Sequence, residues 1–288
     1  MSRFFCDTNS DLWYTLADEL GVDVISMPYS LDGEERGYDL GRNTDFVDYY
    51  YRLANGADAK TQALNMQNYI DYFEPVLQAG EDIIYVHFSR KLSGTFTQMD
   101  SAISYLKEKY PDRKITTVDT KMISLGEGLM VYEAAKLWKN GATDEEIVKF
   151  VEENINNYAL YFTVKDLTQL KRGGRLSAVS FVAGTLLNIK PIIRVDEEGA
   201  LNKCETVKGV KAGLRTLADK VKLLGDDVYN HMIIIAHADA PDFAQEIKAQ
   251  LIHQFGENLN IFVQYIGPTV AAHCGAGAVG IAFHSKSR

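Results

Sequence analysis

One turn of the sequence has the residue types of an anion site. Leu92-Ser93-Gly94-Thr95 follows an apolar stretch and leads into a helical pattern. The free N–H groups and positive end of a helix start favour a carboxylate or phosphate oxygen, and glycine permits close approach of the backbone. We therefore predict that Ser93, Gly94 and Thr95 bind an anion. A capped turn without a ligand is the alternative.

A second candidate is His273, which lies in a glycine-rich segment that runs from Gly267 to Gly277. Glycine at this density implies backbone conformations that most other residues avoid, and such loops often present a side chain to a ligand. A neutral imidazole exchanges hydrogen bonds with a carboxylic acid, and a charged one pairs with a carboxylate. The alternative, with equal weight, is that His273 is a buried structural residue that contacts no ligand.

The same residue types also permit a serine hydrolase. Ser93 would be the nucleophile, His273 the base, and Asp7 or Asp119 the group that orients the base. However, no G-x-S-x-G surrounds Ser93, and both aspartates follow predicted strands, where helix capping is their ordinary role. The turn also lacks the G-K-[ST] and G-x-G-x-x-G patterns of nucleotide sites. The sequence thus favours binding over hydrolysis.

A basic turn stands out in this acidic chain. Lys171, Arg172 and Arg175 flank two glycines, and they form either a solvated turn or a docking surface with forked guanidinium donors. The next residues, 176–189, are apolar around most of a helical circumference and are predicted to be buried. They are either simple core or the wall of an apolar cavity.

Composition limits the classes of function. The 288 residues are 46% hydrophobic, and 30 basic against 39 acidic residues give a net charge of −9, which disfavours a nucleic-acid or membrane-surface partner. Three distant cysteines without C-x-x-C spacing indicate neither a disulfide framework nor a zinc site, so we expect a cytoplasmic protein without a metal. No apolar run approaches the roughly 20 residues that span a membrane, and no signal peptide is expected.

The elements that position these residues alternate between strands and helices. In the first half, residues 3–6, 22–27, 82–88 and 114–118 are predicted strands. One helix is expected to start at an N-cap at Asn9 or Ser10 and to end at Gly21. Ser124-x-x-Glu127 and Thr143-x-x-Glu146 have the spacing of capping boxes. This alternation predicts a mainly parallel sheet between helices.

The second half has a different pattern. Strands are predicted at residues 160–164, 191–195, 203–207, 232–237, 261–265 and 279–283, with helices near 210–224 and 242–255. A hairpin turn at 196–199 predicts a mixed sheet. We therefore expect two α/β domains, residues 1–157 with the head-group site and 158–288, whose last loop and strand return to the cleft between them.

Together these motifs resemble the DegV family over nearly the whole chain. In the family's order, the matching pieces are Asp7 with Ser10-Asp11-Leu12, Leu92-Ser93-Gly94-Thr95, Val118-Asp119-Thr120 with Ser124-x-Gly126-x-Gly128, Leu167-x-x-Leu170-Lys171-Arg172-Gly173-Gly174-Arg175, Ile189-Lys190-Pro191-Ile192-Ile193, and Gly267-Pro268 with His273-x-Gly275-x-Gly277. Six pieces in one order make coincidence improbable.

The resemblance implies a carrier that catalyses nothing and binds no cofactor. A long-chain fatty acid would lie in a tunnel between the domains, with its carboxylate at Thr61, the Ser93-Gly94 turn and His273, while the basic turn faces a separate fatty-acid kinase. Candidates for the tunnel wall are Phe181, Val182, Leu186 and Ile189.

The sequence departs from the family at residues 62–64, where Gln-Ala-Leu follows Thr61 in place of Ser-Gln-Pro. Head-group hydrogen bonding or loop shape is expected to differ there. A lipid-responsive regulatory protein is the remaining alternative to a carrier for the kinase.

Overall fold

A computed structural model describes residues 2–165, 167–175 and 188–288. Its first sheet is parallel, with strand order β2-β1-β6-β7. The strands are β1 (Arg3–Asp7), β2 (Asp23–Ile25), β6 (Ile83–His87) and β7 (Ile115–Asp119). This sheet confirms the four strands predicted in the first half, with their ends shifted by one or two residues. Short helices η1 (Thr8–Ser10) and η2 (Arg90–Leu92) follow β1 and β6.

The second sheet is mixed and has strand order β10-β9-β8-β13-β11-β12. Its strands are β8 (Tyr158–Thr163), β9 (Ile189–Val195), β10 (Leu201–Lys208), β11 (Ile233–His237), β12 (Ile261–Tyr265) and β13 (Val279–His284). Strands β9 and β10 pair antiparallel around the predicted hairpin turn, whereas β11 and β12 are parallel. The predicted fold class, a parallel sheet followed by a mixed one, is confirmed. The domain boundary after residue 157 stays a prediction.

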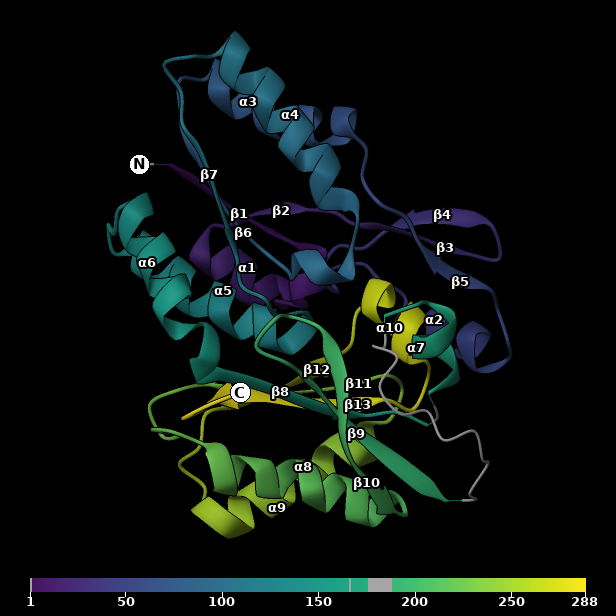
Figure 1. The fold of residues 1–288 in the computed structure, drawn as a ribbon. Coiled ribbons are helices and arrows are strands. Elements are labelled where there is room, and N and C mark those ends of the chain that lie inside the picture. The colour runs from purple at the N-terminus through teal and green to yellow at the C-terminus, as the bar shows by residue number, and fades with distance from the viewer. Residues whose placement is uncertain (1, 166, 176–187) are drawn as a thin grey trace.

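Helices form layers around the two sheets (Figure 1). Helices α3 (Met66–Gln78) and α4 (Thr95–Lys109) cover the outer face of the first sheet, and α8 (Val210–Leu224) and α9 (Pro241–Phe255) cover the outer face of the second. Between the sheets lie α1 (Tyr14–Leu20), α5 (Ser124–Lys139) and α6 (Asp144–Asn154), followed by η3 (Ile155–Asn157). Helix α5 contacts strands of both sheets, so one continuous apolar core joins them.

One predicted helix start is wrong, and one predicted capping box is absent although its helix begins at Ser124 as predicted. Asn9 and Ser10 lie in η1, and α1 begins only at Tyr14, although it ends at Gly21 as predicted. At the start of α5, Ser124 has a φ of +54° and donates its hydroxyl to Asp11 at 2.5 Å. The predicted box at Thr143 is confirmed, because that helix start is exposed and no distant group competes for the caps.

A third, antiparallel sheet was missed by the sequence analysis. It has the order β4-β3-β5, with β3 (Pro28–Leu31), β4 (Glu34–Gly37) and β5 (Ala59–Thr61). The signal was present, because Asp32-Gly33 joins β3 to β4 with positive φ at both residues, as a type I′ hairpin turn requires. Helices α2 (Phe46–Ala54), α7 (Thr168–Arg172) and α10 (Pro268–Cys274) lie near this sheet.

The β9–β10 hairpin is tied to loops of the first sheet. The Arg288 guanidinium donates to the carbonyl oxygens of Thr120, Lys121 and Asp196 at 3.0, 2.9 and 2.8 Å. Ser89 donates to the carbonyl of Gly199 at 2.8 Å. These bonds join the second sheet to the carboxyl edge of the first.

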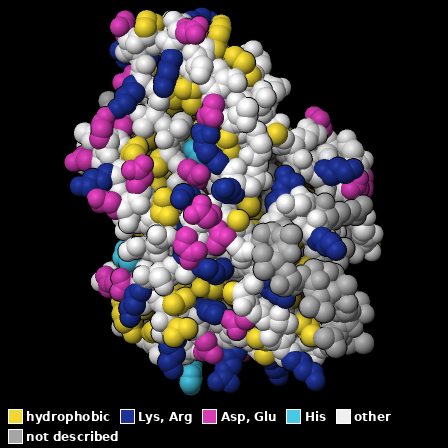
Figure 2. Space-filling view, in the orientation of Figure 1, with side chains coloured by type: hydrophobic (Ala, Val, Ile, Leu, Met, Phe, Trp, Pro, Cys, Tyr) yellow, Lys and Arg dark blue, Asp and Glu magenta, His cyan; other side chains and the backbone are white. Residues whose placement is uncertain are grey.

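The surface mixes both charge signs. On the face drawn in Figure 2, basic and acidic side chains are interspersed, which is in keeping with a modest net charge of −9 over 288 residues. None of the described helices is long and apolar enough to cross a membrane.

Candidate functional site

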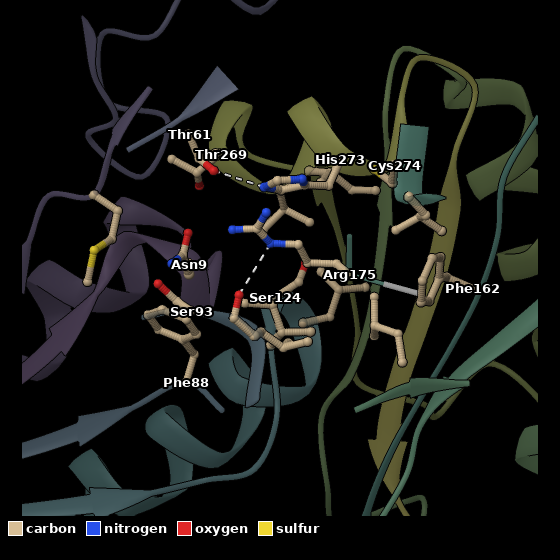
Figure 3. Close-up of a pocket in the computed structure, with 18 of the residues that line it drawn as sticks. Asn9, Thr61, Phe88, Ser93, Ser124, Phe162, Arg175, Thr269, His273 and Cys274 are labelled. Carbon is tan, nitrogen blue, oxygen red and sulfur yellow. Dashed lines mark hydrogen bonds between the residues drawn. The ribbon is translucent and has the colours of Figure 1, made fainter. Parts of the chain in front are cut away.

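A cavity lies where the carboxyl edge of the first sheet meets the second sheet (Figure 3). The loops after β1, β6 and β7 form one wall, strands β8, β10 and β13 form another, and β5 with α10 closes one end. Its lining residues are Asn9, Met27, Thr61, Gln62, Phe88, Leu92, Ser93, Ile123, Ser124, Leu125, Leu160, Phe162, Leu170, Arg175, Leu201, Ile266, Thr269, Val270, His273, Cys274 and Gly280. Most of the lining is apolar, and the polar groups come chiefly from the loops, β5 and α10.

The polar end is organised around a hydrogen bond between Thr61 and His273. The Thr61 hydroxyl lies 2.9 Å from His273 Nε2, although the two residues are 212 positions apart. Thr61 ends β5, where it pairs with Tyr29 of β3. His273 lies in the last turn of α10. The sequence singled out both residues, and the structure brings them together.

His273 is held neutral by its surroundings. Burial, followed by the nearby positive charge of Arg175, lowers the pKa of His273 to about 4. Its ring also packs against the backbone of Gly173, where a Cβ atom would lie 2.6 Å from Nδ1. A neutral imidazole at pH 7 can exchange hydrogen bonds but carries no charge of its own, so the only cation that lines the cavity is Arg175, among the residues that the structure describes.

Thr269 is a polar residue of this end that the sequence analysis did not identify. It lies on α10 beside Thr61 and His273 (Figure 3). Thr269 is 2% exposed, and its hydroxyl has no hydrogen-bond partner among the described residues. A buried hydroxyl without a partner is costly, so such a group in a cavity points to a ligand that satisfies it. The only sequence signal was its place in the Gly267-Pro268 motif.

The predicted anion turn reaches the cavity through Ser93. Ser93 lines the wall, and its hydroxyl accepts a bond from the Thr95 N–H at 3.2 Å. Gly94 precedes the first residue of α4 and has open space where a Cβ would lie. The Thr95 hydroxyl instead bonds the Tyr69 hydroxyl at 2.9 Å and the carbonyl of Leu64 at 3.3 Å. Ser93 is therefore the residue of this turn that lines the cavity, whereas Gly94 and Thr95 are not among the lining residues.

The basic turn is divided between the cavity and the surface. Arg175 lines the cavity and donates from Nε to the carbonyl of Leu92 at 3.3 Å, whereas the sequence analysis assigned it to a partner-facing surface. Lys171 lies on the exposed side of α7. Arg172 ends that helix, and its side chain lies outside the described part.

The predicted apolar wall is only partly described. Phe181, Val182 and Leu186 lie outside the described residues. Ile189 is the half-buried first residue of β9 and is not among the lining residues. The described apolar wall comes from other elements, with Leu160 and Phe162 on β8 among its residues. These strand residues read as ordinary core in the sequence, because a cavity leaves no local pattern.

Residues of the proposed hydrolase triad are not joined to one another. Among the described residues, no hydrogen bond links Ser93 to His273, whose Nε2 contacts Thr61. Asp7 accepts from Tyr85 at 2.8 Å, and Asp119 accepts from backbone N–H groups of Arg90 and Lys121. Both carboxylates thus serve the loops of the first sheet. In the same part of the chain, no group of three potential metal ligands is assembled.

The fold and cavity define an α/β protein that encloses a mainly apolar cavity, with a polar end, between a parallel and a mixed sheet. This chain belongs to the DegV family, whose model matches residues 4–286. A DegV domain-containing protein of Clostridium perfringens is 33% identical over 285 residues, which are 98% of each chain. Another, of Lactococcus lactis, is 33% identical over 288 residues and 99% of each chain. The resemblance in the sequence is thus confirmed.

Solved structures agree with the fold. A fatty acid binding DegV family protein from Streptococcus agalactiae has a TM-score of 0.85 and 27% identity, covering 100% of this chain and 99% of its own. A DegV family protein from Thermus thermophilus, described for its fatty acid binding, has a TM-score of 0.86 and 24% identity over 98% of this chain and 99% of its own. The latter similarity bears on the fold alone.

Proposed function

We propose that the protein binds a long-chain fatty acid in this cavity and presents its carboxylate to a separate fatty-acid kinase. The observation that carries the proposal is the division of the cavity into an apolar wall and a polar end that holds the unpartnered Thr269 hydroxyl. Fatty acid binding by the Streptococcus agalactiae relative supports the same ligand class. In this proposal the protein itself catalyses nothing and binds no metal or nucleotide, which belong to the kinase.

The free energy gained by burying methylene groups supports an acyl chain as the main source of binding affinity. Each buried methylene contributes about 0.8 kcal/mol, so a chain of a dozen or more carbons offsets the cost of ordering it. The head group then needs few hydrogen bonds. Thr61, Ser93, Gly94 and His273 are the proposed carboxylate ligands, joined by Thr269, and the charge of Arg175 lies close by. Thr95, whose hydroxyl is engaged elsewhere, contributes only as the first residue of the helix.

Presentation requires that the carboxylate be reachable from outside. Thr61, Arg175 and His273 also line a second pocket, whose other lining residues include the exposed Asp58 and Lys60. The polar end therefore has the cavity on one side and a surface pocket on the other. Figure 2 shows several basic side chains on the face near α7, and Lys171 is exposed there. We propose that this surface, with Arg172, meets the kinase.

The lipid part of the proposal is tested on protein purified from bacteria. Denaturing extraction is expected to release about one fatty acid per chain, and native mass spectrometry to show the matching mass increment. Protein that is empty and also fails to bind added palmitate or oleate would contradict the assignment. For the kinase part, loaded protein is mixed with a bacterial fatty-acid kinase and ATP, and acyl phosphate is trapped with hydroxylamine. A loaded protein that yields no hydroxamate would instead favour a lipid-responsive regulator.

The Thr269→Val substitution is expected to separate binding from stability. Valine has nearly the shape of threonine without the buried, unpartnered hydroxyl, so the empty protein should be as stable as the wild type or slightly more stable. Palmitate affinity should fall about fivefold, since one hydrogen bond of about 1 kcal/mol to the head group is lost. Urea unfolding and calorimetric titration measure the two quantities. Unchanged affinity would remove Thr269 from the site.

A further inference from the structure

Glu127 is a buried carboxyl group that no donor satisfies. It lies near the start of α5 and is 0% exposed, and neither of its side-chain oxygens has a hydrogen-bond partner among the described residues. The charges that act on it come from Asp7, Asp11 and Asp119, which are all acidic. An ionised carboxyl group that is buried without a partner is strongly unfavourable, and such a group takes up a proton instead. Glu127 is therefore expected to be a neutral acid.

Asp7 is the carboxyl group that faces Glu127. This residue ends β1, is also 0% exposed and lies within hydrogen-bond reach of Glu127. Its carboxylate accepts bonds from the Tyr85 hydroxyl at 2.8 Å and from the Asn9 N–H at 2.9 Å. Two ionised carboxyl groups at this distance would repel each other, whereas a protonated Glu127 has an O–H group that donates to Asp7. Because the described residues also assemble no group of three potential metal ligands, one shared proton is the simplest charge balance.

The pair lies behind the wall of the cavity. On the side of the loop after β1, Asp7 holds the N–H of Asn9, which is a lining residue. On the side of the helix, Ser124 and Leu125 line the same cavity. Helix α5 contacts η1 directly. A bond between Glu127 and Asp7 therefore joins two parts of the wall.

We propose that Glu127 is a positioning residue that holds a proton at neutral pH and donates it to Asp7. The bond fixes the start of α5 to the loop after β1, and so keeps Asn9 and Ser124 in place at the cavity. Without the proton, two like charges would meet where the helix and the loop are in contact, and repulsion would separate them. The inference goes beyond the proposed function, because it holds for any ligand of the cavity.

The shared proton makes stability fall as the pH rises. Burial, followed by the charge of Asp7, raises the pKa of Glu127 in the folded state well above its ordinary value of 4.5. The stability that this group provides is therefore full below pH 4.5 and is lost as the pH rises toward the folded pKa. While the folded protein keeps the proton, each unit of pH lowers the folding equilibrium constant about tenfold. The other titratable groups that face the pair are Cys6, Asp11, Tyr85 and Asp119.

The first test is urea unfolding of ligand-free wild type and Glu127→Gln at pH 7 and 8.5. Glutamine has nearly the same shape and donates an N–H to Asp7, but it does not titrate. Between the two pH values, the folding equilibrium constant of the wild type should fall about thirtyfold more than that of the variant, because one extra proton is bound over about 1.5 pH units. The other titratable groups are common to both proteins and cancel. Glu108→Gln, at an exposed glutamate of α4, is the control and should behave as the wild type.

Infrared spectroscopy detects the proton directly in the wild type. At pH 8.5 the spectrum should contain the carbonyl band of a protonated carboxylic acid, because ordinary carboxyl groups are ionised at this pH. Glu127→Gln should lack the band. A wild type without it, or equal losses of stability in wild type and Glu127→Gln, would overturn the inference.

Amide hydrogen exchange of the empty protein tests the positioning. Glu127→Ala removes the bond to Asp7, so exchange in residues 8–12 and 124–128 should become about tenfold faster relative to the second sheet, whereas Glu127→Gln should keep the wild-type rate. Equal protection of both segments in the three proteins would overturn the positioning role. All these measurements use protein without ligand, so their failure leaves the fatty-acid assignment intact, and a wild type that binds no fatty acid leaves this inference standing.

Discussion

A Gly128→Ala variant is expected to lose about 3 kcal/mol of unfolding free energy, at the upper end of what overpacking costs. Gly128 lies on α5, and a Cβ there would be 2.4 Å from the carbonyl oxygen of Ser10. That oxygen belongs to backbone that cannot rotate away as a side chain would. The helix or the loop after β1 must therefore move, and with it the polar wall at Asn9.

The matched control is Gly126→Ala, two residues earlier in the same helix. A Cβ at position 126 would lie 2.9 Å from the Met122 sulfur, the far part of a flexible side chain, and 3.2 Å from the Leu160 Cβ. Both substitutions gain the same helix propensity, up to about 1 kcal/mol, so their difference isolates the packing. We expect Gly126→Ala to lie within about 1 kcal/mol of the wild type in urea unfolding. Equal midpoints for the two variants would contradict the close approach at Ser10.

His273 is expected to make the empty protein less stable in acid. Burial lowers its pKa in the folded state to about 4, below the ordinary value of 6.5. The unfolded chain therefore binds the proton more readily, and the stability that neutral His273 provides is present above pH 6.5 and is lost as the pH falls toward 4. Between pH 7 and 4.5 this loss amounts to about 2 kcal/mol.

The measurement is urea unfolding of ligand-free wild type and His273→Gln at pH 7 and 4.5. Glutamine keeps a hydrogen-bonding group near Thr61 but does not titrate, so the variant should lose about 2 kcal/mol less on acidification. Burial also lowers the pKa of His87 to about 4 and raises those of Asp7 and Asp11 to about 7, but these groups are common to both proteins and cancel. His253→Gln, at an exposed histidine, is the control. Identical pH dependence in wild type and His273→Gln would show that His273 is not protonated in this range.

A bound fatty acid should shift the pKa of His273 in the opposite direction, toward higher values. A carboxylate beside His273 favours the charged imidazole and raises its pKa. The bound protein should therefore lose less stability between pH 7 and 4.5 than the empty one. A smaller loss in the bound protein would support the proposed position of the head group, since Thr61 and His273 already contact each other at the polar end.

The sequence by itself determined the order and type of most elements and several residues of the site. Strand periodicity, the Thr143 capping box and the hairpin turn at 196–199 are local signals, and exposed or regular segments follow them. The Ser93-Gly94 turn was also identified locally, because a hydroxyl and a glycine before a helix favour anion binding regardless of where the helix packs in the fold. The Asp32-Gly33 hairpin turn was also a local signal, but the sequence analysis did not identify it.

Only the tertiary structure decided which polar groups meet. Ser124 bonds Asp11 instead of capping its own helix, because burial between the sheets puts a carboxylate from 113 residues away within reach. Arg175 lies at the cavity and not wholly on the surface, and Thr269 faces the cavity with its hydroxyl unpartnered. A hydrogen bond acts over about 3 Å, whereas periodicity reports on the chain's next few residues. Which distant groups come within that distance depends on how the two sheets pack around α5.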